Sequence, residues 1–139
     1  IKDIYEEGIV LKHCIHTCDI YFQRMDIRET YLLFLRRTDK PDVPWYTLEI
    51  EPGGNIRQKK SVLNEAYKDL DDAMPFLKKW QQWVKKNLSA KDKKLAEKSD
   101  KARKDGYKQL REEKKLIWHG RLQGTLLADA LENDFMEVV

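Results

Sequence analysis

The chain has 139 residues, of which 41% are hydrophobic and 37% charged, and a formal net charge of +3 at pH 7. This length suits one domain with its own core, and no apolar run approaches the roughly eighteen residues that a membrane span needs. The mild positive charge permits a polyanionic partner without demanding one. The two cysteines stand four residues apart, a spacing that suits reduced thiols in a cytoplasmic protein better than a disulfide. Because the chain opens on Ile1 without an initiator Met or an apolar signal core, we expect a fragment.

The first predicted element is an amphipathic helix, or a turn leading into one, over residues 11–24. Its apolar residues recur at helical spacing: Leu11, Ile15, Cys18 and Phe22. The same segment is rich in possible metal ligands, namely His13, Cys14, His16 and Cys18. A tetrahedral zinc site needs ligands that converge from separate turns or strands, usually as two spaced pairs. We therefore expect cysteines packed as small apolar groups, and no metal site.

Residues 29–60 predict three short strands in succession. Residues 31–35 are an unbroken apolar run, residues 45–50 alternate, and residues 56–59 follow a Pro-Gly-Gly-Asn turn. Both connections are short, which favours an antiparallel meander, because parallel neighbours need a crossover of about a dozen or more residues. On the middle strand one face carries Tyr46, Leu48 and Ile50, and the other carries Trp45, Thr47 and Glu49.

A second helix is predicted after a loop at residues 61–64 and a short helical segment at residues 65–72. Pro75 stands where a helix can begin, since proline is tolerated in the first turn. Apolar residues then recur at spacings of three and four: Phe76, Leu77, Trp80, Trp83, Val84 and Leu88. We expect this helix to cover one sheet face, with both tryptophans in the core.

Residues 89–115 are dominated by charge, with eleven Lys or Arg against six Asp or Glu. The pattern predicts a solvated helix that projects from the domain, stabilised by spaced opposite charges. The functional alternative is a basic arm for nucleic acid, against which the mixed signs count. The candidate contacts to DNA or RNA are Lys91, Lys94, Lys98, Arg103, Lys104, Lys108 and Arg111.

The chain therefore divides into a core over residues 1–88, a charged helical arm over residues 89–117 and a C-terminal segment over residues 118–139. A short helix predicted at residues 125–132 suggests that this last segment returns to the core.

Glu49 is the unusual residue of the middle strand. Its carboxylate either points to solvent, the default for such a residue, or lies in a pocket. His13 precedes a helix that faces the sheet, so it could serve as a general base or as an orienting hydrogen-bond donor. The sequence contains no Gly-rich phosphate loop, HExxH motif or nucleophile elbow.

Several stretches together resemble the PcfJ-like family, whose members are encoded on conjugative plasmids, phages and related bacterial mobile elements. The resemblance covers roughly residues 6–88, and the order of its motifs is specific. The motifs are the His13-Cys14 pair, Tyr21, the apolar strand that leads into Arg36-Arg37, Tyr46-Thr-Leu-Glu49, Ile56-Arg-Gln58 and Asn64. Two places depart from the family pattern: His16-Thr-Cys-Asp19 replaces a small residue and a hydroxyl or a tyrosine, and Lys59-Lys60 replaces a glycine.

On the predicted meander these family positions suggest one candidate catalytic set: His13, Tyr21, Glu49 and Gln58. Arg36 could pair with Glu49 across neighbouring strands, which is the structural explanation of both residues. By analogy of residue types alone, such a set would suit nucleotide binding or an ADP-ribosyltransferase-like reaction.

We therefore expect an α+β fold, a small antiparallel meander flanked by helices with a long charged C-terminal helix. The leading function is an accessory protein of a mobile element that acts with DNA, RNA or a relaxosome-type protein complex, with no membrane partner. The alternatives are an enzyme with a pocket on the sheet and a protein–protein interaction module. The sequence identifies neither a cofactor nor an oligomeric state.

Overall fold

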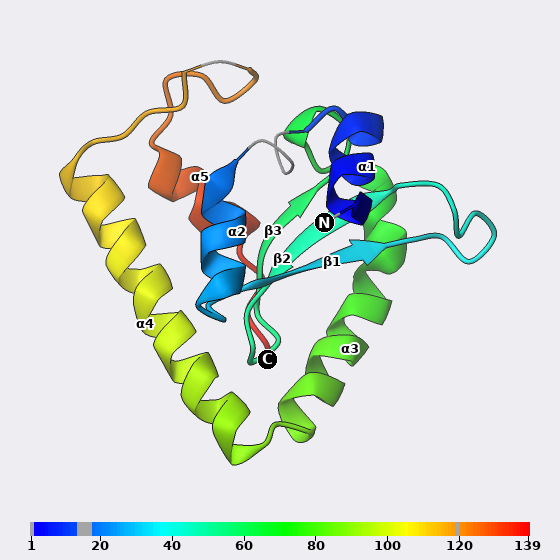
Figure 1. Cartoon of the computed structure of the whole chain (residues 1–139). Helices are drawn as coiled ribbons and strands as arrows, with labels where there is room; N and C mark the ends of the chain where they lie inside the picture. Colours follow the sequence, from blue (N-terminus) through cyan, green and yellow to red (C-terminus); the bar gives the residue numbers. More distant parts are fainter. Residues whose placement is uncertain (1, 14–17, 119) are drawn as a thin grey trace.

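The computed structural model describes residues 2–13, 18–118 and 120–139, and it confirms the α+β fold. A three-stranded antiparallel sheet in the order β1-β2-β3 is formed by β1 (Tyr31–Leu35), β2 (Tyr46–Ile50) and β3 (Ile56–Lys60). All three strands match the predicted segments to within a residue. The sheet lies between α3 and α4, which diverge from a common apex like the arms of a V (Figure 1).

The helices of the described residues come before and after the sheet. Before it stand α1 (Lys2–Leu11) and α2 (Asp19–Asp26). After it come the short 3-10 turns η2 (Val62–Asn64) and η3 (Lys68–Ala73), then α3 (Met74–Lys86), α4 (Ala90–Glu112) and α5 (Leu127–Asp134). Within the described part of the chain no helix has the length and apolar character needed to cross a bilayer.

Of the two alternatives predicted for residues 11–24, a helix over the whole segment is wrong, and a turn that leads into a helix agrees with the described residues. Leu11 is the last residue of α1, and the backbone of Lys12 turns left-handed at a φ of 53°, which ends that helix. The second helix begins only at Asp19. Cys14 and His16, which the sequence grouped with His13 as possible metal ligands, lie outside the described residues. Among the residues that are described, no group of three or more His, Cys, Asp or Glu side chains is placed to hold a metal ion.

One face of the sheet forms the main apolar core, as the alternation of the middle strand predicts. Tyr46, Leu48 and Ile50 are buried there against residues of η3 and α3, including Leu70 and Leu77. The hydroxyl of Tyr46 donates to the Asp69 carboxylate at 2.7 Å, and burial raises the pKa of Tyr46 to about 12. This side chain therefore stays neutral and ties the sheet to η3.

The ends of α3 and α4 follow from local chemistry. Pro75 lies in the first turn of α3, and Lys85 and Lys86 lie in its last turn, where cations favour the helix dipole. Ser89 then caps α4 in a capping box with Asp92, each side chain bonding the backbone amide of the other. The turn from α3 into α4 is therefore specified by residues 87–92.

The tryptophans of α3 do not share one environment. Trp80 packs partly buried against the core, as predicted. Trp83 is 63% exposed, so the expectation that both rings are core residues is wrong for this one. The face of α3 that packs against the core is narrower than its apolar spacing predicted, since its fully buried residues are Leu77 and Gln81.

The charged helix α4 lies against the domain instead of projecting from it. Ser99 and Arg103 are its buried residues, and both contact groups on the second face of the sheet. The C-terminal segment returns to the sheet: Met136 pairs with Ile56 through backbone hydrogen bonds of 2.9 and 2.8 Å. The β3 edge is thereby closed at that point.

Candidate functional site

The second face of the sheet is a buried polar layer. Three carboxylates lie there, Glu7 from α1, Glu49 from β2 and Glu51 just after β2, each exposed by 2% or less. Alternation along β2 brings Glu49 to this face, opposite the apolar side of Leu48 and Ile50. Charges are rarely buried without partners, so their neighbours decide what this layer can do.

Each carboxylate has its own guanidinium. Glu7 forms an ion pair with Arg36, so the predicted pairing of Arg36 with Glu49 is wrong. Arg24 of α2 instead donates to both oxygens of Glu49, at 3.1 and 2.9 Å. No sequence pattern favours Arg24 as the partner, because the contact joins α2 to β2 and depends on how the helix crosses the sheet.

Glu51 is paired twice. Arg57 donates to it at 2.6 Å through Nε, and Arg103 of α4 contacts its other oxygen. A β-bulge between Glu49 and Ile50 makes Arg57 the extra residue of β3. Although burial alone would lower the pKa of Arg57, its hydrogen bonds to Glu51 and Glu29 and the charges of Glu51 and Glu49 raise it, so the guanidinium stays charged.

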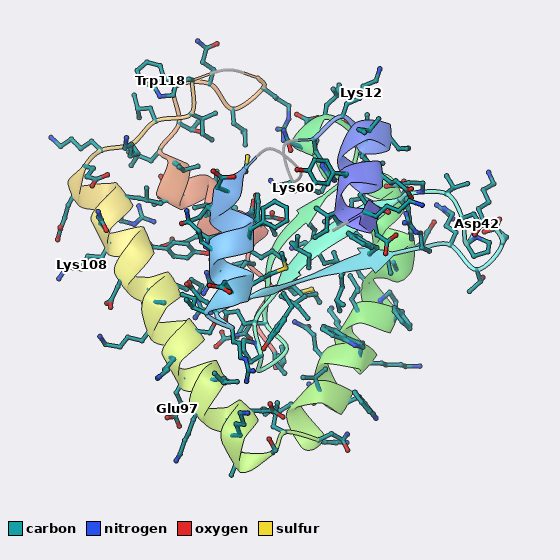
Figure 2. The ribbon with its side chains drawn as sticks, viewed as in Figure 1. Lys12, Asp42, Lys60, Glu97, Lys108 and Trp118 are labelled. Atoms are coloured by element: carbon teal, nitrogen blue, oxygen red, sulfur yellow. The ribbon has the colours of Figure 1, made fainter. Side chains whose placement is uncertain are left out.

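The four residues predicted as a catalytic set line one small pocket on this face. We call it the polar pocket, and its lining residues are His13, Tyr21, Thr47, Glu49, Gln58, Lys60 and Asn64. Its cavity is about 10 Å³, space for about one water molecule. Lys60 lies at the end of β3 between α1 and α2 (Figure 2).

Within the polar pocket Glu49 is held firmly. Besides Arg24, it accepts hydrogen bonds from the hydroxyl of Thr30 at 2.8 Å and from the amide of Gln58 at 3.0 Å. Gln58 stands directly opposite Glu49 in the β2–β3 register. With its oxygens occupied, Glu49 is an anchor for the surrounding side chains more than a free base.

His13 is linked to a second carboxylate. Its Nε2 lies 2.9 Å from the Thr47 hydroxyl, which donates to Glu7 at 3.3 Å. Because a hydroxyl has one hydrogen, Nε2 of His13 must then carry the proton that it shares with Thr47. In the neutral ring this tautomer leaves Nδ1 as the basic nitrogen.

Glu7 was missed in the sequence, although a signal exists. The buried residues of α1 are Ile4, Glu7, Gly8 and Leu11, so the carboxylate stands within a helical apolar stripe. Burial raises the pKa of Glu7 above its usual value of 4.5, and the Arg36 charge and the hydrogen bonds from Arg36 and Thr47 oppose that rise. An acidic residue within such a stripe indicates that the helix packs against other buried polar groups.

The predicted nucleic-acid contacts on α4 fall into two groups. Lys104 pairs with Asp100 at 2.7 Å, Arg111 pairs with Asp129 and Glu132, and Arg103 is buried against Glu51. The exposed candidates that form no ion pair with a described residue are Lys91, Lys94, Lys98 and Lys108. Lys108 projects outward from α4, and Glu97 projects from the same outer side (Figure 2).

A denser cationic surface lies on α3, where the sequence did not place one. Residues 73–91 contain no Asp or Glu, and the exposed lysines of α3 are Lys78, Lys79, Lys85 and Lys86. None of these four forms an ion pair with any described residue. The sequence already shows that this segment lacks acidic residues. Its apolar spacing, however, led us to interpret it as a helix that packs on the core, and its lysines were not considered as a binding surface.

Comparison with known proteins identifies a family. A family model described as PcfJ-like protein matches residues 1–74, slightly more than half of the chain. No curated protein and no solved structure gives a significant match. The matched part includes every residue that lines the polar pocket and ends where α3 begins, so the lysines of α3 and α4 lie outside it. The chain belongs to the PcfJ-like family.

Proposed function

We propose that this protein acts with nucleic acid as an accessory protein of a bacterial mobile element. The proposed binding surface, which we call the cationic surface, comprises α3 and the first half of α4. Its lysines that form no ion pair with a described residue are Lys78, Lys79, Lys85, Lys86, Lys91, Lys93, Lys94 and Lys98. The observation that carries the proposal is that these cations have no carboxylate partner among the described residues, whereas Lys104 and Arg111 do.

Unpaired lysines are the physical requirement for binding a polyanion. A lysine that already pairs with a carboxylate gains little from a phosphate, because the ion pair must first be broken. A free lysine displaces condensed counterions from the nucleic acid, and their release drives binding. The cationic surface therefore differs from the basic arm expected on the whole of α4, since Arg103, Lys104 and Arg111 are excluded from it.

Salt dependence tests this proposal. Binding of a labelled single-stranded and a labelled duplex oligonucleotide is measured by fluorescence anisotropy over a range of salt concentrations. We expect affinity to fall steeply with salt, and the double variant Lys79→Gln/Lys86→Gln to lower the slope of log K against log salt by about 2. A flat response of the unmodified protein would contradict nucleic-acid binding.

The matched control removes two lysines that are already paired. Lys2 pairs with Glu6 and Lys101 pairs with Asp105, both on exposed helix faces. The double variant Lys2→Gln/Lys101→Gln changes net charge by the same amount, so it separates a local surface from a general charge effect. We expect its salt slope to stay close to that of the unmodified protein.

A second candidate function, an enzyme or nucleotide-binding protein, is favoured by one specific observation. His13, Tyr21, Glu49 and Gln58 come from separate elements and line the same polar pocket. The cavity of about 10 Å³ is far smaller than a nucleotide, so a ligand would require side chains at its mouth to move. For that reason this function stands second.

Binding of NAD⁺ or ATP, measured by titration calorimetry, tests the second candidate. Saturable binding that weakens several-fold in Tyr21→Phe would support it, because this change removes only the hydroxyl from the pocket lining. Tyr67→Phe is the matched control, since the Tyr67 hydroxyl donates to the Val62 carbonyl and Tyr67 is not among the residues that line the pocket. Absence of binding at millimolar ligand would count against a nucleotide site.

A further inference from the structure

An aromatic hollow opens between α3 and the start of α4. It has a volume of about 300 Å³, and its apolar lining includes Tyr31, Pro52, Trp80, Trp83 and Leu88. This volume is at the lower end of the range for small-molecule pockets. Its helical lining residues come from the second half of α3 and the start of α4, among them Trp83 and Asp92. These two helix ends meet at the apex of the V (Figure 1). Three aromatic rings at the mouth of an open hollow are suited to a flat, apolar-faced ligand.

Trp83 is the most accessible of these rings. With 63% of its surface exposed, the indole is left in water where a core tryptophan would be covered. Trp83 also lines a shallow outer groove of about 400 Å³ together with Lys79 and Lys86. It therefore stands between an aromatic hollow on one side and two unpaired lysines on the other.

A second exposed ring extends the same helix face. Phe76 is 59% exposed and lies seven residues, two helical turns, before Trp83. At about 1.5 Å of rise per residue the two rings are separated by about 10 Å along α3. Lys79 lies between them and Lys86 follows, so aromatic and cationic side chains alternate along one stripe.

The acidic groups near the hollow are already occupied. Glu51 lines the hollow itself, and its charge is neutralised by Arg57 and Arg103. Asp92 accepts the backbone amide of Ser89 in the capping box. Asp92 keeps its negative charge, but the exposed lysines of α3, among them Lys79 and Lys86 beside Trp83, leave this surface with a net positive charge.

We propose that single-stranded nucleic acid is the ligand of this surface, with a base stacked on Trp83 at the aromatic hollow and its flanking phosphates at Lys79 and Lys86. The proposal rests on the nucleic-acid function above and names its substrate class. Bases in a duplex are already stacked and paired, so an indole can reach a base face only in an unpaired strand. Lysines alone would bind duplex and single strand through the same phosphates.

A lipid surface fits the stripe less well. Membrane-binding helices bury a continuous apolar face in the lipid. In α3 the buried positions, Leu77 and Gln81, face the protein. Its outward stripe instead interleaves lysines with single aromatic rings, the arrangement of proteins that bind single strands.

The test compares three labelled ligands by fluorescence anisotropy: oligo(dT), oligo(rU) and a DNA duplex of equal length. We expect Trp83→Leu, which keeps apolar bulk but removes the ring, to weaken single-strand binding on the order of tenfold. Duplex binding should change little, and Trp83→Phe should restore most of the single-strand affinity. Circular dichroism confirms that each variant is folded. The matched control is Trp118→Leu, because this ring is 79% exposed on the loop after α4.

The possible outcomes distinguish failure of the stacking site from failure of the nucleic-acid function. If Trp83→Leu and the unmodified protein bind single strands equally while Lys79→Gln/Lys86→Gln weakens both forms, the stacking site is refuted and the nucleic-acid function survives. If no oligonucleotide binds, both proposals fail. Binding to vesicles of phosphatidylcholine and phosphatidylserine, lost in Trp83→Leu and unaffected by oligonucleotides, would overturn the proposal in favour of a lipid surface. A stronger effect on oligo(dT) than on oligo(rU), or the reverse, identifies DNA or RNA as the source.

Discussion

At the scale of single residues, two carboxyl groups, Glu7 in the polar layer and Asp69 beside the apolar core, have pKa values that are shifted in opposite directions. Glu7 is completely buried, and burial raises its pKa above 4.5 although Arg36 and Thr47 oppose the rise. Asp69 shows the opposite balance. Burial alone would raise the pKa of Asp69, but hydrogen bonds from Trp45 and Tyr46 hold it below its usual value of 3.8. These two carboxyls should therefore affect stability with opposite pH dependence.

The first prediction concerns Glu7→Gln. Because the folded-state pKa of Glu7 is raised, the folded protein binds more protons than the unfolded chain above about pH 4.5, and stability is lost as pH rises through that window. Glutamine does not titrate. We expect the free energy of unfolding of the unmodified protein, minus that of Glu7→Gln, to fall between about pH 4 and about pH 7 in urea titrations.

Asp69→Asn is the control of opposite sign. Its lowered folded-state pKa gives stability that is present above about pH 3.8 and lost as pH falls. The corresponding difference should therefore rise between about pH 3 and about pH 5. If the Glu7 difference does not change with pH, Glu7 titrates in the folded protein as it does in the unfolded chain.

The same residues show where sequence reasoning ended. His13, Tyr21, Glu49 and Gln58 were grouped through the family resemblance, and they do line one pocket. The alternation of β2 correctly separated Glu49 from the apolar face, but solvent was its default surrounding. Burial of Glu49 depends on Arg24, whose contact is set by tertiary packing and leaves no periodic signal.

At the scale of elements, local patterns were sufficient for most of the chain. The strands follow from β-branched and aromatic runs bounded by Pro and Gly. The start of α3 follows from its first-turn proline, and the start of α4 follows from its capping box. The helix α1 was not predicted, because Glu7 and Gly8 interrupt its apolar stripe. Whether a helix such as α4 projects or packs depends on single buried residues, here Ser99 and Arg103, which composition cannot reveal.

The second prediction belongs to α4. Gly106 lies inside this helix, and a Cβ added there would meet no atom within 4 Å. It also lines a cavity of about 70 Å³ beside Arg57 and Tyr107. Glycine in a helix interior costs about 0.5–1 kcal/mol relative to alanine, so Gly106→Ala should raise the free energy of unfolding by about that amount.

Gly54→Ala is the matched control, measured in the same urea titrations. Gly54 has a φ of +97°, and an added Cβ would lie 3.2 Å from Val138 and 3.3 Å from Val84. The same substitution should therefore destabilise the protein by about 1 kcal/mol or more at this position. A loss of stability in Gly106→Ala would mean that the space beside the helix is occupied.

At the scale of the whole molecule, the C-terminal segment connects the sheet to α3 and α4. Met136 exchanges backbone hydrogen bonds with Ile56 of β3, and its carbonyl also accepts from Gln81 of α3 at 3.0 Å. The guanidinium carbon of Arg103, in α4, lies over the Phe135 ring at 4.0 Å from the ring centroid. Residues 135–136 thus contact both layers: Met136 contacts α3 on the side of the apolar core, and Phe135 contacts Arg103 of the polar layer.

The third prediction tests this connection with Met136→Pro. Proline removes the N–H that donates to the Ile56 carbonyl at 2.8 Å, and Ile56 is fully buried. The preceding residue, Phe135, already has an extended backbone with a ψ of 130°, which a following proline favours, so the main change is the lost donor. We expect the free energy of unfolding to fall by about 1–3 kcal/mol.

Glu137→Pro is the control one residue along, where the N–H makes no backbone hydrogen bond among those found in the described residues. It should leave stability nearly unchanged. Hydrogen exchange adds a local readout, because loss of the Met136 contact should speed exchange of the β3 amides beyond the global change in stability. Equal stability of the two variants would mean that the C-terminal segment only covers the sheet edge. A selective loss in Met136→Pro would establish that both layers depend on one backbone pairing far from the strands in sequence.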